Sequence, residues 1–157
     1  MFESMGVDTN ASDWQDAASA RLTEGLGGGH LVVAVVDAPD PVGGLAASGI
    51  AAIVEQLPGP TNPTGLEARI SSMSTNTGHR RQGMASAVID RLLAELDDRG
   101  IERIELHATP EGRPLYESRG FGPRPGGDEM RLVERRQGTM RSTQSMVRAI
   151  GSLPYDS

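Results

Sequence analysis

The chain has 157 residues and a mass of 16.6 kDa, which is the size of one domain rather than two. Hydrophobic residues make up 37% of it and 20 glycines add to them, an ordinary globular composition that excludes disorder over most of the length. The net charge of −6 argues against general nucleic-acid binding, and no segment approaches the roughly 18 successive apolar residues that a membrane-spanning helix needs.

Several kinds of site are excluded by residue types that the chain lacks. Cysteine is absent, which excludes disulfides, thiolate metal sites and a cysteine nucleophile. The three histidines, His30, His79 and His107, are spaced too widely for a metal motif, so we expect no metal. All 15 basic residues are arginines, whose guanidinium groups bind anions but do not act as bases. The first residues have neither the basic region nor the apolar core of a secretory signal peptide. We therefore expect a cytoplasmic protein.

A helix is predicted near the amino terminus, over residues 12–22. Its apolar side chains, Trp14, Ala17, Ala18 and Leu22, are spaced for one helix face. The glycine-rich run 25–29 follows. Because a strand comes next, where a dinucleotide-binding loop would open a helix, we interpret this run as a flexible turn rather than a cofactor loop.

Three strands are predicted next. Residues 31–36 and a second apolar run that reaches Leu57 flank the turn formers of segment 37–44, which is typical of an antiparallel hairpin. After a loop at 58–65, residues 67–75 form a third strand with an unusually polar end: Ser71, Ser72, Ser74 and Thr75. These hydroxyls either line a site or satisfy the local backbone, and the second interpretation is favoured for any one of them.

The strongest helical pattern follows the third strand. Its apolar residues recur at offsets of three and one, on a single helix face, and are Ala85, Val88, Ile89, Leu92, Leu93 and Leu96. We expect Gly100 to end this helix. The period changes to two over residues 101–108, which predicts a strand, and residues 111–119 predict a short helix that Gly120 ends.

Phe121 and residues 129–133 supply material for closing strands. The order is therefore β-β-β-α-β-α-β, which indicates an α+β or mixed α/β layer fold. Residues 134–157 lose this periodicity and are rich in Arg, Ser and Thr. We therefore expect one domain over residues 1–133 and a mostly mobile tail over 134–157.

The segment Arg80-Arg81-Gln82-Gly83-Met84-Ala85 joins the polar strand to the long helix. A strand that enters a helix through a turn with a small residue lets backbone N–H groups approach an anion, and the helix dipole favours negative charge at the same place. Because the Gly-Lys-Ser/Thr of a nucleotide-hydrolysing loop is absent, the pattern favours a pyrophosphate rather than nucleotide hydrolysis.

At these residues the sequence resembles the GNAT superfamily of acetyl-CoA-dependent N-acetyltransferases. The family's pyrophosphate loop reads Arg/Gln-x-x-Gly-x-Gly/Ala, which Arg80, Gly83 and Ala85 match. The family also has a later helix that ends Leu-Tyr-x-x-x-Gly-Phe, and here Leu115-Tyr116-Glu117-Ser118-Arg119-Gly120-Phe121 is complete. Two motifs at the expected separation, joined by the expected elements, make the resemblance specific over about residues 31–133.

The resemblance implies an acyl-CoA N-acyltransferase fold: a central, mostly antiparallel sheet that contains a splayed parallel strand pair, flanked by helices. It implies that acetyl-CoA is the co-substrate and that its pyrophosphate binds the loop, through Arg80, Arg81, Gln82, Gly83, Met84 and Ala85. The alternative is a helix start with two solvated arginines. The pantetheine arm would lie between the strands that end near Thr75 and Ala108, where Ser74 and Thr75 suit such a lining. Thr109 stands where many relatives carry Asn.

The resemblance also implies an acid for the leaving thiolate. Tyr116 occupies the family's acid position, and its alternative interpretation is an amphipathic core tyrosine. The base is open. Some relatives carry Glu on the strand before the loop, where this chain has Arg69. Glu67 shares that strand face and His79 lies at the loop; either can assist, although the favoured interpretation of each is a surface residue, and a water-mediated base is the preferred account.

One departure from the family lies upstream. Relatives begin with a strand and helix, whereas this chain starts within that helical region, so we expect the first strand and part of the first helix to be missing. The exposed sheet edge would then be covered by a partner such as a second copy, or by the tail.

The functional expectation is acetyl transfer from acetyl-CoA to a primary amine of a small molecule or peptide, by direct attack in a ternary complex. We expect neither nucleic acid nor membrane as a partner. The alternatives are a catalytically weak acyl-CoA-binding or regulatory module, and a small interaction domain that uses the arginine-rich tail.

Overall fold

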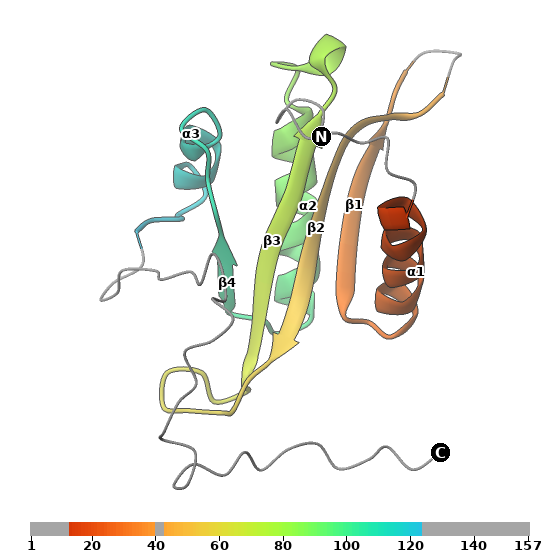
Figure 1. Cartoon of the computed structure of the whole chain (residues 1–157). Helices are drawn as coiled ribbons and strands as arrows, with labels where there is room; N and C mark the ends of the chain where they lie inside the picture. Colours follow the sequence, from red (N-terminus) through yellow and green to blue (C-terminus); the bar gives the residue numbers. More distant parts are fainter. Residues whose placement is uncertain (1–12, 40–42, 124–157) are drawn as a thin grey trace, which may run out of the picture. The chain divides into compact units, whose positions relative to one another are not determined.

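The computed structural model describes residues 13–39 and 43–123. These residues form one sheet with helices, in an order that Figure 1 shows from red to cyan: α1 (Asp13–Gly27), β1 (Leu31–Asp37), β2 (Leu45–Glu55), β3 (Leu66–Thr75), the short 3₁₀ turn η2 (Thr77–His79), α2 (Met84–Asp98), β4 (Arg103–Leu106) and α3 (Arg113–Glu117). The strand order is β1-β2-β3-β4. The first two pairings are antiparallel and the third is parallel, so the predicted α+β fold is confirmed.

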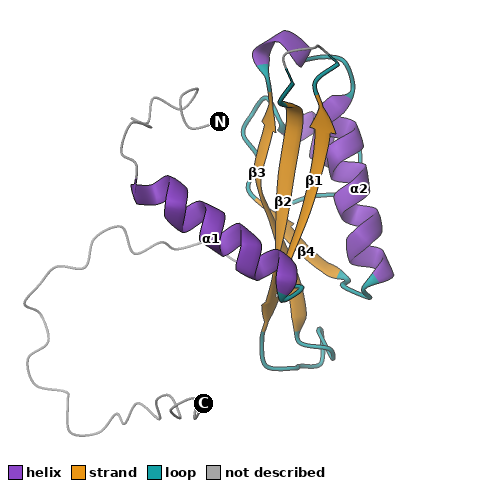
Figure 2. Ribbon diagram, turned by 90° about the vertical axis from the view of Figure 1, so that its right-hand side faces the viewer, coloured by secondary structure: helices purple, strands orange, loops and turns teal. Residues whose placement is uncertain are grey.

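Helix α2 covers one face of the sheet: it lies behind the strands in Figure 1 and to their right in the turned view of Figure 2. Its predicted apolar stripe is confirmed, because the side chains of Val88, Ile89, Leu92 and Leu96 are all buried. They pack on small strand residues such as Ala51. Burying a side chain of this size contributes about 1.5–3 kcal/mol, so the stripe fixes α2, and the loop that precedes it, on the sheet.

The glycine-rich run corrects one expectation. Helix α1 continues through Gly27, so the turn predicted over residues 25–29 is restricted to Gly28 and Gly29. Tertiary packing explains the difference: Gly25 is buried, and a Cβ there would come within 2.5 Å of the Leu31 side chain. The close approach of α1 to β1 therefore outweighs the low helix propensity of glycine.

Other element ends differ from the sequence predictions by a few residues. Strand β4 occupies only the middle of segment 101–108, and α3 only the middle of segment 111–119. Gly100 has φ +68° and follows Arg99, the C-cap residue of α2, as expected of a residue that ends a helix. The closing strand at 129–133 and the tail at 134–157 lie outside the described residues. A compact unit ends at Phe121, so a domain end at residue 133 stays a prediction.

Strand β1 lies at one edge of the sheet. It is seven residues long, mostly aliphatic, and Val35 on it is half-exposed. Such an edge can pair with another strand, so its covering by a second copy or by the tail stays a prediction. No helix within the described ranges is long and apolar enough to cross a membrane.

Candidate active site

A bulge in β3 separates it from β4. Strand β2 pairs with β3 at Ser48↔Ser74 and at Ile50↔Ser71, so Gly49 alone faces two residues of β3. One of the two, Ser72, has φ +54°, which a non-glycine residue rarely adopts. An extra residue of this kind bends the strand that carries it and increases its twist. The bulge therefore explains why β3 turns away from its parallel neighbour.

The parallel pairing stops just before the bulge. It covers residues 67–70 of β3 and Arg103–Leu106 of β4, and its last pair is Ile70↔Leu106. Strand β3 then continues for five more residues, to Thr75, while the chain after β4 leads to α3 (Figure 1). On the side toward β4, the backbone of residues 71–75 therefore has no strand partner within the described part. This exposed edge can hydrogen-bond an extended ligand as a further strand would.

The loop between β3 and α2 presents backbone donors. Arg81 and Gly83 both have positive φ, +58° and +80°, and Gly83 is the residue before the first turn of α2. Within the described residues, no backbone or side-chain acceptor is paired with the amide N–H groups of residues 81–86. The first turn of α2 also lacks acidic residues. Six free donors at the positive end of a helix dipole form an environment suited to an anion.

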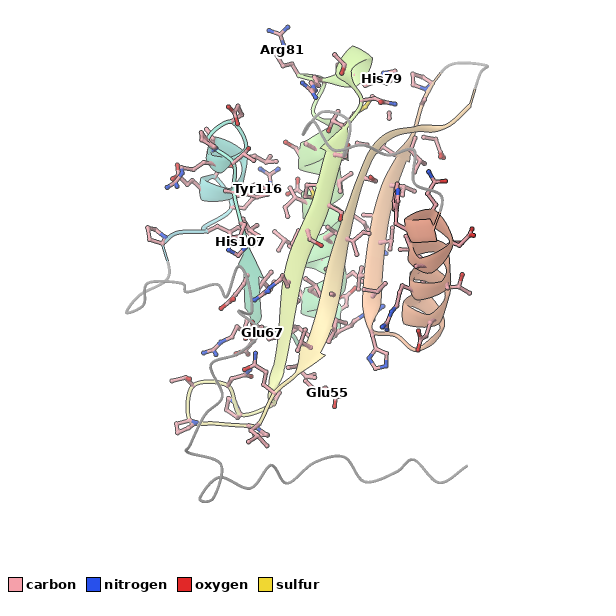
Figure 3. The ribbon with its side chains drawn as sticks, in the orientation of Figure 1. Glu55, Glu67, His79, Arg81, His107 and Tyr116 are labelled. Carbon is pink, nitrogen blue, oxygen red and sulfur yellow. The ribbon has the colours of Figure 1, made fainter. Side chains whose placement is uncertain are left out.

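The side chains of this loop differ in how they are held. Arg80 Nε donates to the Thr75 carbonyl at 3.4 Å, and Gln82 Nε2 donates to the Gly78 carbonyl at 3.1 Å. These bonds hold the loop against the end of β3 and the η2 turn, which precede it in the chain. Arg81 is exposed and points away from the sheet, whereas His79 lies on the η2 turn (Figure 3). Among the residues that the structure describes, Arg80 is thus held by the end of β3, whereas Arg81 has no bonded partner and can reach a ligand.

Tyr116 is the buried residue of α3, with 8% of its surface exposed. Its ring meets that of Phe121 edge to face, with centroids 6.1 Å apart, and it belongs to the same buried cluster as Ile70. Burial raises the pKa of the phenol above its usual range. No residue in the described part hydrogen-bonds to its hydroxyl. Tyr116 is thus a protonated donor whose O–H is available at neutral pH.

Thr109 begins the turn that leads into α3. Its Oγ1 accepts a hydrogen bond from the Gly112 amide at 3.2 Å, and its carbonyl accepts from Gly112 and Arg113. The threonine therefore shapes the entry to the helix that carries Tyr116. The hydroxyl hydrogen is still available to a ligand.

Glu67 is buried, with 6% of its surface exposed, so the expectation of a surface residue is wrong for it. Its Oε2 accepts a hydrogen bond from Gln56 at 3.1 Å. It lies opposite Arg103 in the paired part of β3, three residues before the last pair with β4. Figure 3 shows it at the end of β3 away from the η2 loop. The structure therefore brings the loop and the polar end of β3 together, but leaves Glu67 apart from them.

Three features of the site were not predicted from the sequence. One is the bulge, for which the serine run offered only an ambiguous signal. Another is the pair Arg69–Glu105, 3.9 Å apart across the two parallel strands, which has no local sequence signature. The third is the ion pair between Asp90 and Arg119, which joins residues 29 positions apart in the chain.

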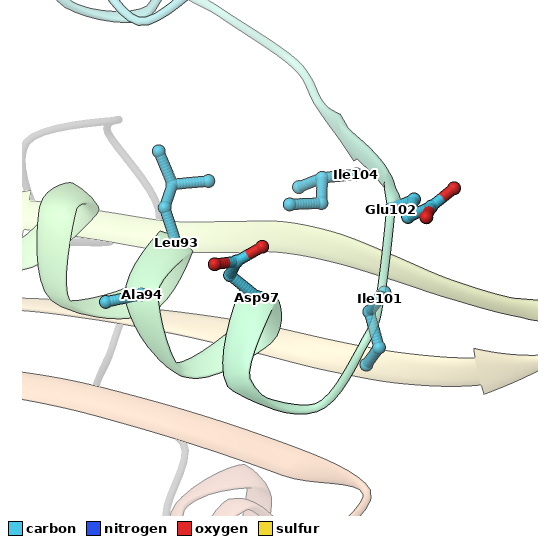
Figure 4. Close-up of a pocket in the computed structure, with 6 residues that line it drawn as sticks. All are labelled: Leu93, Ala94, Asp97, Ile101, Glu102 and Ile104. Atoms are coloured by element: carbon cyan, nitrogen blue, oxygen red, sulfur yellow. The ribbon is translucent and has the colours of Figure 1, made fainter.

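A separate hollow of about 420 Å³ lies between the end of α2 and the start of β4 (Figure 4). It is lined by Leu93, Ala94, Asp97, Ile101, Glu102 and Ile104. The charged side chains in this lining are both carboxylates, which repel phosphate, so the hollow does not suit the pyrophosphate expected at the loop. Within the described residues, no group of three or more His, Cys, Asp or Glu side chains forms a metal site.

Comparison with known proteins gives a consistent result. The family model described as an acetyltransferase (GNAT) domain matches residues 15–130. A curated relative, the uncharacterized N-acetyltransferase YsnE of Bacillus subtilis, is 39% identical over 57 residues, or 33% of this chain. The match spans 38% of the length of that relative.

Solved structures resemble the chain over most of its length. A protein from Clostridium acetobutylicum, described as a predicted acetyltransferase with acetyl-CoA, is 27% identical with a TM-score of 0.72, over 86% of this chain and 85% of that one. A GCN5-related N-acetyltransferase from Ralstonia eutropha is 28% identical with a TM-score of 0.65, over 83% and 84%. A glucosamine-6-phosphate N-acetyltransferase from Arabidopsis thaliana, 18% identical with a TM-score of 0.65 over 82% and 83%, shares the fold.

Proposed function

Because the chain belongs to the GNAT acetyltransferase family, we propose that it transfers the acetyl group of acetyl-CoA to a primary amine of a small molecule or peptide. One observation carries the proposal: the unpaired amides of residues 81–86 lie directly after the unpaired edge of β3. A pyrophosphate bound at these amides leaves the rest of an extended cofactor beside the open edge of β3. The similar acetyltransferase from Clostridium acetobutylicum, whose structure is described with acetyl-CoA, supports the same cofactor.

The cofactor is placed by main-chain groups and a few side chains. The amides of residues 81–85, which include Gln82, Met84 and Ala85, hold the pyrophosphate, and Arg81 adds a charge-assisted contact. Arg80 supports the loop through its bond to Thr75 and adds positive charge. The pantetheine arm runs along the open edge of β3, past Ser74 and Thr75. Thr109 lines the opposite side, beyond the end of β4.

An alkylammonium must lose two protons to become the amide, one before the attack and one from the nitrogen of the tetrahedral intermediate, and the leaving thiolate must gain one. An alkylammonium has a pKa near 10.4, so about one molecule in a thousand is neutral at physiological pH and the amine must be deprotonated. Its nitrogen then attacks the thioester carbonyl, and the tetrahedral intermediate expels coenzyme A. Tyr116 donates its phenolic proton to the leaving sulfur, whose pKa as a free thiol is near 8.5.

Glu67 is the proposed proton acceptor, and it acts through water. It is a buried carboxylate on β3, on the strand face opposite to that of Ala68 and Ile70, which pack in the core cluster. Its place before the last β3–β4 pair is too far from the open edge for direct contact, because each strand residue advances about 3.3 Å. A chain of waters is therefore needed to connect the amine to this carboxylate.

Two measurements test the proposal. Calorimetric titration with acetyl-CoA is expected to show binding that weakens when acetyl-pantetheine, which lacks the phosphates, is used instead. Release of free thiol across a panel of small-molecule and peptide amines is then expected to find an acceptor. Absence of binding at millimolar acetyl-CoA contradicts the cofactor assignment, and hence the function.

A weakly catalytic acyl-CoA-binding module is a second candidate. It is favoured by Arg69, which occupies the position where some relatives have a glutamate base and pairs with Glu105. Tight binding of acetyl-CoA without thiol release across the whole panel would support this second candidate over the first.

A further inference from the structure

All three guanidinium nitrogens of Arg119 donate hydrogen bonds to groups on α2 and at the end of α3. Its Nε and one terminal nitrogen bind the two carboxylate oxygens of Asp90 at 2.6 and 3.0 Å. The other terminal nitrogen donates to the Leu115 carbonyl at 3.0 Å and to the Ser118 hydroxyl at 2.9 Å. The guanidinium fork thus joins α2, which carries Asp90, to the end of α3.

Helix α3 needs such an attachment. It has five residues, far fewer than the roughly 12–15 at which an isolated helix becomes even marginally stable in water. Tyr116 and Phe121 pack it on the core through an edge-to-face ring contact. A two-point ion pair has a defined plane and direction, so it fixes orientation as well as distance.

The partner helix is the one that begins at the open amides. Asp90 lies two turns into α2, seven residues after Gly83. The ion pair therefore connects the helix that presents the amides to the helix that presents the phenol. We propose that Asp90 and Arg119 are positioning residues, whose ion pair holds the Tyr116 hydroxyl at a fixed distance from the anion-binding start of α2. This inference rests on the proposed function of Tyr116.

The pKa of Tyr116 can report on how firmly α3 is held, because no charged group on α3 accounts for its shift. Arg113 and Glu117 form a separate pair on the helix itself, 3.8 Å apart and more than half exposed. Burial, rather than a charged neighbour, is the cause that raises the pKa of Tyr116. Loosening α3 would admit water to the phenol, and the pKa of Tyr116 would move back toward its ordinary value.

The first experiment measures this pKa directly. The chain has only two tyrosines, Tyr116 and Tyr155, so in a Tyr155→Phe background the ultraviolet titration reports Tyr116 alone. Asp90→Asn keeps the side-chain shape and removes the charge. We expect it to lower the titration midpoint by about half a pH unit or more. Arg91→Gln is the matched control, because it breaks the exposed Arg91–Glu95 pair on the same helix and touches no part of α3.

The second experiment measures turnover in the full chain. We expect Asp90→Asn and Arg119→Lys to lower kcat about tenfold, which corresponds to about 1.4 kcal/mol, with KM for acetyl-CoA within about twofold of the wild type. Lysine keeps the charge but lacks the planar fork. Asp90→Glu keeps the carboxylate and is expected to recover much of the lost kcat.

The outcomes separate this inference from the proposed function. If Asp90→Asn leaves both the titration midpoint of Tyr116 and kcat unchanged, Asp90 and Arg119 do not position the phenol. So does a loss of kcat that Arg91→Gln reproduces, because the effect would then be general. If no amine is acetylated by the wild type, the proposed function fails, whereas the tyrosine titration still decides whether Asp90 and Arg119 position the phenol.

Discussion

Gly49 of β2 lies directly across from the bulge in β3, beneath the side chain of Met73. A Cβ at this position would collide with the Met73 sulfur and come within 2.8 Å of Val88 Cγ1 and 3.1 Å of Leu92 Cδ1 on α2. Two elements, β3 and α2, therefore converge on a residue of β2 that has no side chain. The open edge of β3 depends on this contact, because the bulge can fit only where β2 leaves room for it.

Gly49→Ala is expected to destabilise the fold by about 1–3 kcal/mol, since a methyl group has no space between the bulge and α2. Urea unfolding measures the loss. Gly59→Ala is the matched control, because a Cβ there meets nothing within 4 Å and its φ lies outside the left-handed region. Equal stability of the two variants would contradict the tight packing at Gly49.

Gly83→Ala is expected to raise KM for acetyl-CoA about tenfold, the effect of losing roughly one hydrogen bond to a charged group. Gly83 has φ +80°, so a side chain strains the turn that aims the amides. The control is Gly29→Ala, which introduces similar strain at φ +73° in the turn between α1 and β1, also in open space. Both should lose similar stability, and a KM change in both would refute the assignment of the loop.

Tyr116→Phe is expected to lower kcat about 100-fold while acetyl-CoA affinity changes little, because the ring still fills its place and only the proton donor is lost. Steady-state kinetics and calorimetry separate the two effects. Tyr155→Phe serves as the control for tyrosine loss. Full turnover in Tyr116→Phe would leave the phenol with a packing role only.

The raised pKa of Tyr116 predicts how stability depends on pH. The unfolded chain ionises this phenol near pH 10, whereas the folded chain retains the proton to higher pH. The stabilising contribution is therefore complete below about pH 10 and is lost as the pH rises through the folded pKa. Thermal unfolding between about pH 9 and 11 should show a steeper decline for the wild type than for Tyr116→Phe. Parallel curves would contradict this linkage.

Glu67→Gln is expected to lower kcat at neutral pH about tenfold or more, because the amide cannot accept the proton of the amine. Glu55→Gln is the control: Glu55 is an exposed carboxylate at the end of β2, near Glu67 in Figure 3. A wild-type kcat in Glu67→Gln would transfer the base role to another group or to bulk water.

Much of the fold was predictable because its signals are local. The stripe from Val88 to Leu96 has helical spacing, and residues 31–36 are aliphatic and bounded by turn formers, so α2 and β1 follow from short-range patterns. The glycine run was misjudged for the opposite reason. Gly25 of α1 lies against the side chain of Leu31 on β1, and this packing of one element on the next leaves no mark in the local pattern, although the two residues are only six positions apart.

The sequence by itself determined the order of the elements from α1 to α3, the loop motif before α2 and the tyrosine of α3, since each depends on residues close together in the chain. Only the tertiary structure decided where β3 and β4 part, which amides stay unpaired, and that Glu67 lies in the paired region. It also joined Asp90 to Arg119. The physical reason is that a bulge and an ion pair depend on strand register and helix packing, and these arise only when distant segments meet.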